Sequence, residues 1–238
     1  MKLFPGRQTR QEYLDTQIAR SRSKFRYCKV SLHDVLRYRV ILARDRRLQG
    51  DRHWPGPVLC LGTRSGREVD LFRVGLFGGA LRRGAAALAE IKRNSYLTLV
   101  PPLESVGRSD LMRLGPTSVV GVEVNPDAAR GDVLIGSFDE MPASWSGRFG
   151  IVFSNSFDQS QDPRRTATEW RRVTRPGGYL IVCFAPGVEP NATDPVGQLT
   201  LSDVQALFEG ELVFFRHRGS RKGFSEAIVR TPGGEGDA

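Results

Sequence analysis

Residues 57–68 (Pro-Val-Leu-Cys-Leu-Gly-Thr-Arg-Ser-Gly-Arg-Glu) constrain the fold more than any other stretch, because a short apolar run stops at a glycine and a second glycine follows closely. Residues 58–61 are the uninterrupted apolar stretch that is typical of a parallel strand covered on both faces. Gly62 and Gly66 let the backbone turn sharply against a ligand, and a helix-compatible pattern comes next. The stretch therefore predicts a strand, a tight turn and a helix start, which place a nucleotide-like ligand at the carboxyl edge of an open α/β sheet.

The length and composition limit the class of protein. With 238 residues and 39% hydrophobic content, the chain can form one sizeable domain with an extension. It contains no run of the roughly 20 apolar residues that a membrane span needs. The first ten residues lack the apolar core of a secretory signal, so we expect a cytoplasmic protein that does not enter a membrane. The three cysteines, Cys28, Cys60 and Cys183, cannot all pair and have no ligand cluster around them, which predicts reduced thiols and no metal site.

The positive charge is concentrated at the N-terminus. Residues 1–52 contain 14 Lys or Arg against five Asp or Glu, whereas the rest of the chain contains 21 of each. This segment alone therefore accounts for the formal net charge of +9. Such a basic extension can bind nucleic-acid phosphates, face an acidic substrate or partner, or remain a solvated surface.

The same extension is predicted to be helical. A weak helix is expected over residues 12–22. Ser31, followed three positions later by Asp34, is typical of a helix N-terminus, and apolar residues then recur at helical spacing to about residue 46. We therefore expect residues 1–52 to form a basic helical extension that packs on the body, with residues 50–57 as a linker.

Three residues of the extension are candidates for contact with a ligand. Phe25 and Tyr27 could close over a bound substrate, and His33 could reach it. The alternative is that the aromatic residues only anchor the extension and that His33 only begins a helix. The sequence leaves both interpretations open.

Strands and helices alternate through the body, which predicts a doubly wound α/β sheet with right-handed crossovers. Further strands are expected at residues 119–124, 149–153 and 179–184, and residues 132–142 are expected to form a short strand followed by a loop. A helix ends at Val173, and residues 175–178 (Arg-Pro-Gly-Gly) are predicted to turn the chain. Residues 79–117 exceed what a simple strand-helix-strand unit needs and form an insertion. Towards the C-terminus we expect a helix that Ser202 caps, a strand at 211–216, a turn at 219–223, an antiparallel strand at 224–230 and a mobile tail at 231–238.

Polar residues at the ends of the predicted strands mark a binding site. Glu123 ends the second strand, where a carboxylate can accept hydrogen bonds from both ribose hydroxyls of an adenosine group and disfavours a 2′-phosphate. An exposed strand-end charge before an ordinary Asn-Pro turn is the alternative. Asn155 follows the strand at 149–153 and faces the same edge, and Asp158 comes three residues later.

Four segments occur in an order that matches one known family. They are residues 61–66, Val122-Glu123, residues 136–142 (Gly-Ser-Phe-Asp-Glu-Met-Pro) and residues 169–182, which include the Pro-Gly-Gly turn. Together they resemble the glycine motif, the acidic second-strand motif, the adenine loop and the fifth-strand region of class I S-adenosylmethionine-dependent methyltransferases. The resemblance covers about residues 57–230 and implies a Rossmann-like sheet of about seven strands whose last hairpin is antiparallel. It implies S-adenosylmethionine as cofactor, bound by Gly62, Thr63, Arg64, Gly66, Glu123, Val124, Ser137, Phe138 and Asn155.

The chain departs from the family pattern at three positions. Cys60 stands where the family commonly has an acidic residue late in the first strand, and Arg64 replaces a middle glycine. Arg64 is therefore a candidate partner of the cofactor's carboxylate, through a charge-assisted hydrogen bond. Ser137 replaces the usual acceptor of the adenine amino group, which leaves its hydroxyl, Asp139 or a backbone group for that contact.

These features favour an enzyme that methylates an oxygen, nitrogen or carbon nucleophile of a small molecule. The candidate general bases are Asp158 and His33, and a base is needed only when the nucleophile arrives protonated. Tyr27 is the candidate substrate contact. The alternatives are an RNA methyltransferase that uses the basic extension and a non-catalytic cofactor-binding partner protein. A dinucleotide dehydrogenase is disfavoured, because Arg64 and Arg67 occupy positions of its glycine fingerprint. The oligomeric state stays open, and a homo-oligomer is compatible with the sequence.

Overall fold

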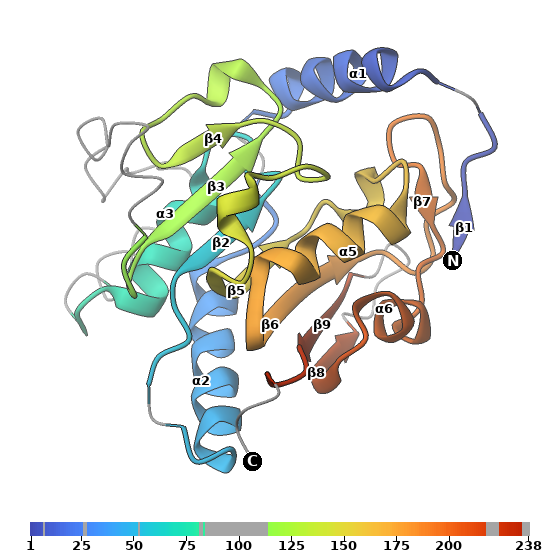
Figure 1. The fold of residues 1–238 in the computed structure, drawn as a ribbon. Coiled ribbons are helices and arrows are strands. Elements are labelled where there is room, and N and C mark those ends of the chain that lie inside the picture. The colour runs from blue at the N-terminus through green and yellow to red at the C-terminus, as the bar shows by residue number, and fades with distance from the viewer. Residues whose placement is uncertain are drawn as a thin grey trace.

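The computed structural model describes residues 1–6, 8–25, 28–51, 53–80, 83, 114–217 and 224–234 (Figure 1). Within them, a seven-stranded sheet has the order β4-β3-β2-β5-β6-β9-β8. Its strands from β4 to β6 are parallel, and β9 is antiparallel to both β6 and β8. The predicted doubly wound sheet with an antiparallel last hairpin is thus confirmed. The strands are β2 (Val58–Leu61), β3 (Val119–Glu123), β4 (Val133–Ile135), β5 (Phe149–Ser154), β6 (Thr174–Phe184), β8 (Glu211–His217) and β9 (Ser225–Arg230).

Helices cover both faces of this sheet, and α1 lies across the carboxyl ends of β2 and β3 (Figure 1). A small second sheet pairs β1 (Lys2–Leu3) with β7 (Val196–Gly197). The α-helices are α1 (Arg10–Ser23), α2 (Leu32–Leu48), α3 (Arg67–Phe72), α5 (Pro163–Val173) and α6 (Leu201–Phe208). A π-helical turn, η1 (Arg73–Phe77), continues α3, and short 3₁₀ turns are η3 (Pro126–Ala128), η4 (Ala143–Trp145) and η5 (Phe157–Gln159).

The alternation of side chains along each strand divides the core into two layers. In β2, Val58 and Cys60 pack with α2 and α3, whereas Leu59 and Leu61 pack on the side of α5 and α6. All four are at most 1% exposed. The two-sided burial explains why β2 has an unbroken apolar sequence rather than an alternating one.

The N-terminal caps of α2 and α6 can be compared with the capping residues predicted from the sequence. At α2 the predicted cap is confirmed: the Ser31 hydroxyl accepts from the Asp34 N–H, and the Asp34 carboxylate accepts from the Ser31 N–H. At α6 the expectation was wrong by two residues. Thr200, not Ser202, has the extended backbone of a cap and shares a reciprocal capping box with Asp203, so the helix begins at Leu201.

The strand expected from residue 179 begins earlier. Thr174 already pairs with Phe149, and Tyr179 pairs with Ile151 after a shift of register. The Pro-Gly-Gly turn is therefore a bulge inside β6 rather than a separate connection. Other expectations lie outside the described residues: most of the insertion at 79–117, the turn at 219–223 and the last four residues of the tail.

Candidate functional site

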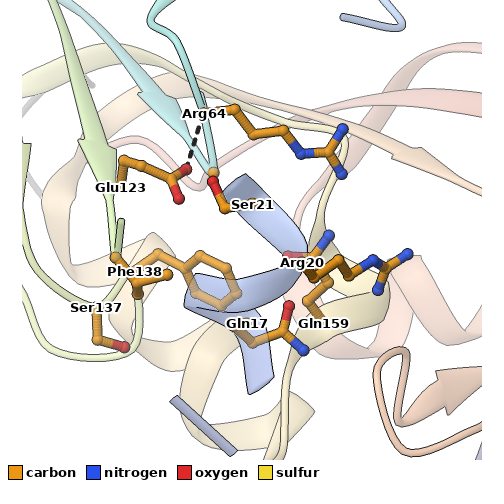
Figure 2. A pocket seen from close by; sticks show the side chains of 10 residues that line it. Gln17, Arg20, Ser21, Arg64, Glu123, Ser137, Phe138 and Gln159 are labelled. Atoms are coloured by element: carbon orange, nitrogen blue, oxygen red, sulfur yellow. Dashed lines mark hydrogen bonds between the residues drawn. The ribbon is translucent and has the colours of Figure 1, made fainter. Parts of the chain in front are cut away.

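A pocket lies where β2 and β3 end, and α1 closes it from the opposite side (Figure 2). Of the residues predicted to bind a cofactor, the following line it: Gly62, Arg64, Glu123, Val124, Ser137 and Phe138. Further lining residues come from α1 and from η5: Gln17, Arg20, Ser21 and Gln159. The pocket thus joins segments of the chain that are more than a hundred residues apart.

The turn after β2 has an unusual backbone. Gly62 and Gly66 have φ values of +72° and +75°, in the left-handed region that glycine adopts without strain. A Cβ at Gly62 would lie 2.7 Å from the Ser156 hydroxyl, so a side chain has no room there. Arg64 is also left-handed, with φ of +49°, at the position where the family has a glycine. The fold therefore keeps the glycine-like backbone there and adds a guanidinium group.

Glu123 connects the turn with the end of β3. Its Oε2 accepts a hydrogen bond of 2.7 Å from the Arg64 backbone N–H, and its Oε1 accepts one of 3.2 Å from the Asn125 N–H. The residue is only 4% exposed yet lines the pocket. A carboxylate has about four acceptor positions, so the two backbone contacts orient Glu123 and leave positions for ligand hydroxyls.

The loop after β4 forms a second wall. The Phe138 ring packs edge-on against Trp170 with ring centroids 5.6 Å apart, and the Phe138 carbonyl accepts from the Trp170 indole N–H at 3.1 Å. Asp139 is bound internally, because its carboxylate accepts from the hydroxyls of Ser137 and Thr166. Asp139 is absent from the pocket lining, which leaves Ser137 and Phe138 as the loop residues that face the pocket.

Three other predicted cofactor residues lie beside the pocket rather than in its lining. Thr63 is 1% exposed, and its hydroxyl oxygen faces Gly121 of β3. Gly66 packs against the side chain of Arg130. Asn155 donates from Nδ2 to Glu68 Oε1 at 3.4 Å and accepts from the Ser156 hydroxyl. These residues support the turn and the end of β5.

The two candidate bases have different surroundings. His33 is exposed on the first turn of α2 and is not among the pocket-lining residues. Asp158 lies in η5, next to the lining residue Gln159, and its buried Oδ1 accepts no hydrogen bond from the described residues. Tyr27, the candidate substrate contact, lies outside the described residues.

Burial and neighbouring charges both act on Asp158. Burial, reinforced by repulsion from Asp194, raises the pKa of Asp158 to about 6, although Lys29, Arg20 and Arg64 act in the opposite direction. Burial also lowers the pKa of Lys29, whose Nζ lies 3.5 Å from the centroid of the Phe224 ring. Asp158 can therefore accept a proton near neutral pH.

The contribution of α1 was not predicted from sequence. Tyr13, Gln17 and Ser21 are buried at four-residue spacing, which places them on one face of the helix. The Tyr13 hydroxyl donates to the Gln159 carbonyl, Gln17 donates to the Thr193 carbonyl, and Arg20 forms a two-pronged ion pair with Asp194. Because this buried face is polar, a search for apolar periodicity could not find it.

Glu68 is a second functional candidate that the sequence did not reveal. It lies in the first turn of α3, is 3% exposed, and its buried Oε2 accepts no hydrogen bond from the described residues. Burial raises the pKa of Glu68 to about 7. The Cys28 thiol and the Asn155 amide both hydrogen-bond to this carboxyl, so Glu68 belongs to a buried polar cluster beside the pocket and is not one of its lining residues.

Comparisons with known proteins agree with this geometry. A family model described as a methyltransferase domain matches residues 106–182. The 1,6-didemethyltoxoflavin-N1-methyltransferase of Burkholderia thailandensis, solved with 1,6-didemethyltoxoflavin and S-adenosylhomocysteine, has a TM-score of 0.56 at 14% identity, with 97% of this chain and 94% of that chain covered. The [4+2]-cyclase SpnF has a TM-score of 0.54 at 13% identity, with 98% and 100% covered. At these identities the likeness concerns the fold. No curated protein matches the sequence.

The sheet order and the glycine turn are those of a Rossmann-like fold, and the family model of a methyltransferase domain matches residues 106–182, about a third of the chain.

Two further findings concern the described residues alone. They contain no group of three or more His, Cys, Asp or Glu side chains placed to hold a metal ion. None of the helices among them is both long enough and apolar enough to cross a membrane.

Proposed function

We propose that this protein transfers the methyl group of S-adenosylmethionine to an oxygen, nitrogen or carbon nucleophile of a small molecule. The main support is the closure of the pocket by α1, which places Gln17, Arg20 and Ser21 opposite Glu123 (Figure 2). A pocket with protein on both sides fits a small acceptor better than a polymer that needs an open groove.

The residues present fit the cofactor. Glu123 lines the pocket as a carboxylate with acceptor positions for ribose hydroxyls, and the tight turn at Gly62 lets the backbone approach a ligand. Phe138 supplies an aromatic wall with its carbonyl already bound by Trp170. We assign Glu123 to the ribose, Ser137 and Phe138 to the adenine, and Arg64 to the carboxylate at the methionine end.

The charges of the extension also favour a small acceptor over RNA. Arg10, Arg22 and Arg37 form ion pairs with body acids at 2.8, 2.9 and 2.6 Å, and Arg20 pairs with Asp194. The body partners are Glu140, Asp127 and Glu226, in that order. Four of the 14 basic residues of the extension thus pair with acids of the body, which supports a role in holding the extension on the pocket.

The protein does not have to activate the methyl group itself. When bound, the cofactor supplies a methyl group on a sulfonium that is already activated. The chain's own residues hold the reactants in line and exclude water, and this alignment contributes much of the rate. We assign Asp158 as the base that takes the proton of a protonated nucleophile, because its Oδ1 accepts no hydrogen bond within the described part of the chain and its pKa is raised to about 6.

Calorimetry with S-adenosylmethionine and S-adenosylhomocysteine tests the cofactor assignment. We expect the wild-type protein to bind both compounds and Glu123→Ala to bind them at least about tenfold more weakly. Glu209→Ala, which changes an exposed carboxylate at the C-terminus of α6, should bind as the wild type does. An intact wild-type protein that binds neither compound would defeat the proposal.

Transfer of an isotopically labelled methyl group distinguishes the acceptor classes. The protein is incubated with labelled S-adenosylmethionine and either total RNA or a cell extract filtered to contain only small molecules. Label in the small-molecule fraction supports the proposal. Label in RNA alone, with binding that weakens steeply as salt increases, would instead support an RNA methyltransferase.

A further inference from the structure

A second cleft, of about 960 Å³, lies at the opposite edge of the sheet from the pocket beside Glu123. Its walls are the C-terminal end of α2, the bulge near the start of β6, the turn between α6 and β8, and the residues that follow β9. The pocket beside Glu123 lies where the parallel strands end, whereas this cleft lies where β6 begins. The residues that line the two spaces have no member in common. A cleft of this volume is large enough for a small organic ligand.

The carboxylates that line or adjoin this cleft already form ion pairs with arginines. The pairs are Asp45 and Glu211 with Arg230, Asp51 with Arg46, and Glu209 with Arg171. Asp45 also accepts a hydrogen bond of 2.8 Å from the Tyr179 hydroxyl. These acids are therefore occupied by cations that the fold places beside them.

Arg175 lines the cleft without such a partner. Within the described part of the chain, its guanidinium group forms neither a hydrogen bond nor an ion pair, and only its backbone carbonyl is bound, by the Thr231 hydroxyl at 2.9 Å. The side chain is partly buried in the wall of the cleft. A cation placed in this way can pair with an anionic ligand.

Arg46 brings a second guanidinium group to the same cleft. Its side chain is 5% exposed, its Nη2 pairs with Asp51, and its buried Nε donates to no acceptor among the described residues. Burial lowers the pKa of Arg46, and repulsion from Arg175 acts in the same direction. The two guanidinium groups are thus close enough to repel each other, and an anion bound between them would relieve that repulsion.

We propose that this cleft binds a small organic phosphate, whose phosphate group is held by Arg175 and Arg46. A phosphate monoester carries a charge of about −1.5 to −2 at pH 7, so it matches two guanidinium groups better than a singly charged carboxylate does. The exposed rings of His53, Pro176 and Pro232 border the same cleft and offer surfaces to the organic part of the ligand. The site is separate from the pocket for methyl transfer and does not depend on the proposed function.

Calorimetry with three probes tests this site: phenyl phosphate, inorganic phosphate and benzoate. We expect saturable binding of phenyl phosphate, weaker binding of inorganic phosphate and the weakest binding of benzoate. Arg175→Gln removes no hydrogen bond from the described residues, so it should fold normally and bind phenyl phosphate at least about fivefold more weakly. The matched control is Arg148→Gln, which removes an exposed arginine outside the cleft lining and should change the affinity less than about twofold.

Three calorimetric outcomes would overturn the proposal. The first is that neither phosphate compound binds the wild-type protein. The second is that Arg148→Gln weakens binding as much as Arg175→Gln, which would make net charge the cause. The third is that benzoate binds as tightly as phenyl phosphate, which would mean that the cleft does not select a phosphate.

Nuclear magnetic resonance of the histidine rings places the bound probe. His53 lines the cleft, whereas His33 and His217 do not. At constant pH, phenyl phosphate should shift the His53 signals in the wild type and shift them much less at the same concentration in Arg175→Gln. Saturation with S-adenosylhomocysteine should leave this shift unchanged. A shift confined to the other histidines, or loss of the shift when S-adenosylhomocysteine is added, would place the probe elsewhere and refute the site, while leaving the methyltransferase proposal untouched.

Discussion

The backbone N–H of Arg64 donates a hydrogen bond of 2.7 Å to Oε2 of Glu123, across 59 positions of sequence. This bond joins the turn after β2 to the end of β3, so the residues expected to hold the methionine end and the ribose of one ligand are positioned by each other. The two segments also pair as parallel strands, with Leu61 beside Val122. The geometry of the site therefore depends on the pairing of β2 with β3, and neither motif alone determines it.

Removal of the Glu123 carboxylate should affect both binding and folding. Glu123→Ala leaves the N–H groups of Arg64 and Asn125 without their acceptor, which we expect to lower the free energy of unfolding by about 1–3 kcal/mol. Affinity for S-adenosylhomocysteine should fall at least about tenfold. Glu123→Gln retains one acceptor oxygen and should lose less stability. Denaturant unfolding and calorimetry measure the two effects, and unchanged affinity in the alanine variant would contradict the ribose assignment.

Arg64→Gly removes the guanidinium group but lets the turn keep its left-handed backbone. A left-handed backbone costs a side-chain-bearing residue about 1–2 kcal/mol, and glycine adopts it without that cost. We therefore expect the free energy of unfolding of the variant to lie within about 1 kcal/mol of the wild-type value. Its affinity for S-adenosylhomocysteine should nevertheless fall about tenfold, while 5′-deoxy-5′-methylthioadenosine binds as before.

Arg64→Ala is the matched control, because it removes the same guanidinium but keeps the strain of the left-handed backbone. The two variants should lose the same affinity. If S-adenosylhomocysteine binds Arg64→Gly as tightly as wild type, Arg64 does not contact the carboxylate of the ligand.

Asp158 predicts a pH profile for catalysis. Burial and Asp194 raise its pKa to about 6 against the opposing effects of Lys29, Arg20 and Arg64, so the carboxyl is protonated and inactive as a base at lower pH. With an acceptor that must lose a proton, kcat/KM should rise as the pH increases through about 6. Asp158→Asn should lower kcat by about 10²–10⁴ and flatten this limb. A limb that survives in the variant would exclude Asp158 as the base.

Glu68 predicts the pH dependence of stability in the ligand-free protein. Its pKa is about 7 in the folded state against an ordinary value of 4.5. Between these pH values the unfolded chain binds fewer protons than the folded one, so the free energy of unfolding falls as the pH rises, by at most about 3 kcal/mol from this group. Urea unfolding at pH 5 and pH 8 should show a smaller loss in Glu68→Gln. Identical losses in the two proteins would contradict the shifted pKa.

The ion pair between Arg20 and Asp194 is expected to hold α1 over the pocket. The pair is two-pronged, mostly buried and joined to a hydrogen bond with the Thr193 carbonyl. Arg20→Gln should therefore make proteolysis within α1 faster and the release of S-adenosylhomocysteine several-fold quicker.

Arg22→Gln is the control for this variant. The pair between Arg22 and Asp127 is exposed on both sides, and such pairs contribute only about 0–1 kcal/mol. Limited proteolysis and stopped-flow release should therefore show little change. Equal effects of the two substitutions would mean that net charge, rather than the Asp194 contact, holds α1.

The sequence was sufficient for features that depend on local chemistry. The apolar run of β2, the left-handed glycines 62 and 66, and the Ser31 cap each follow from the preferences of a few adjacent residues, and the structure confirms them. Ser202 was a wrong cap because Thr200, two residues earlier, offers the same chemistry with the reciprocal Asp203 contact.

Features that depend on packing could not be predicted in this way. A polar helix face that docks on η5, as in α1, has no periodic apolar signal. Glu68 looks like a surface charge in sequence, and only the approach of Cys28, Cys60 and Asn155 makes it a buried group. The roles of the predicted site residues remain predictions until the binding experiments are done.

Helix α2 has a consequence for how the chain reaches its native state during synthesis. Tyr38 and Arg37 bond to Glu226 of β9 at 2.7 and 2.6 Å, and Arg230 bonds back to Asp45 at 2.8 Å. Helix α2 thus finds these partners only after the roughly 180 residues that separate it from β9 have been synthesised. Such long-range closure slows folding. Until then the basic segment lacks these partners, and repulsion between its positive charges opposes aggregation.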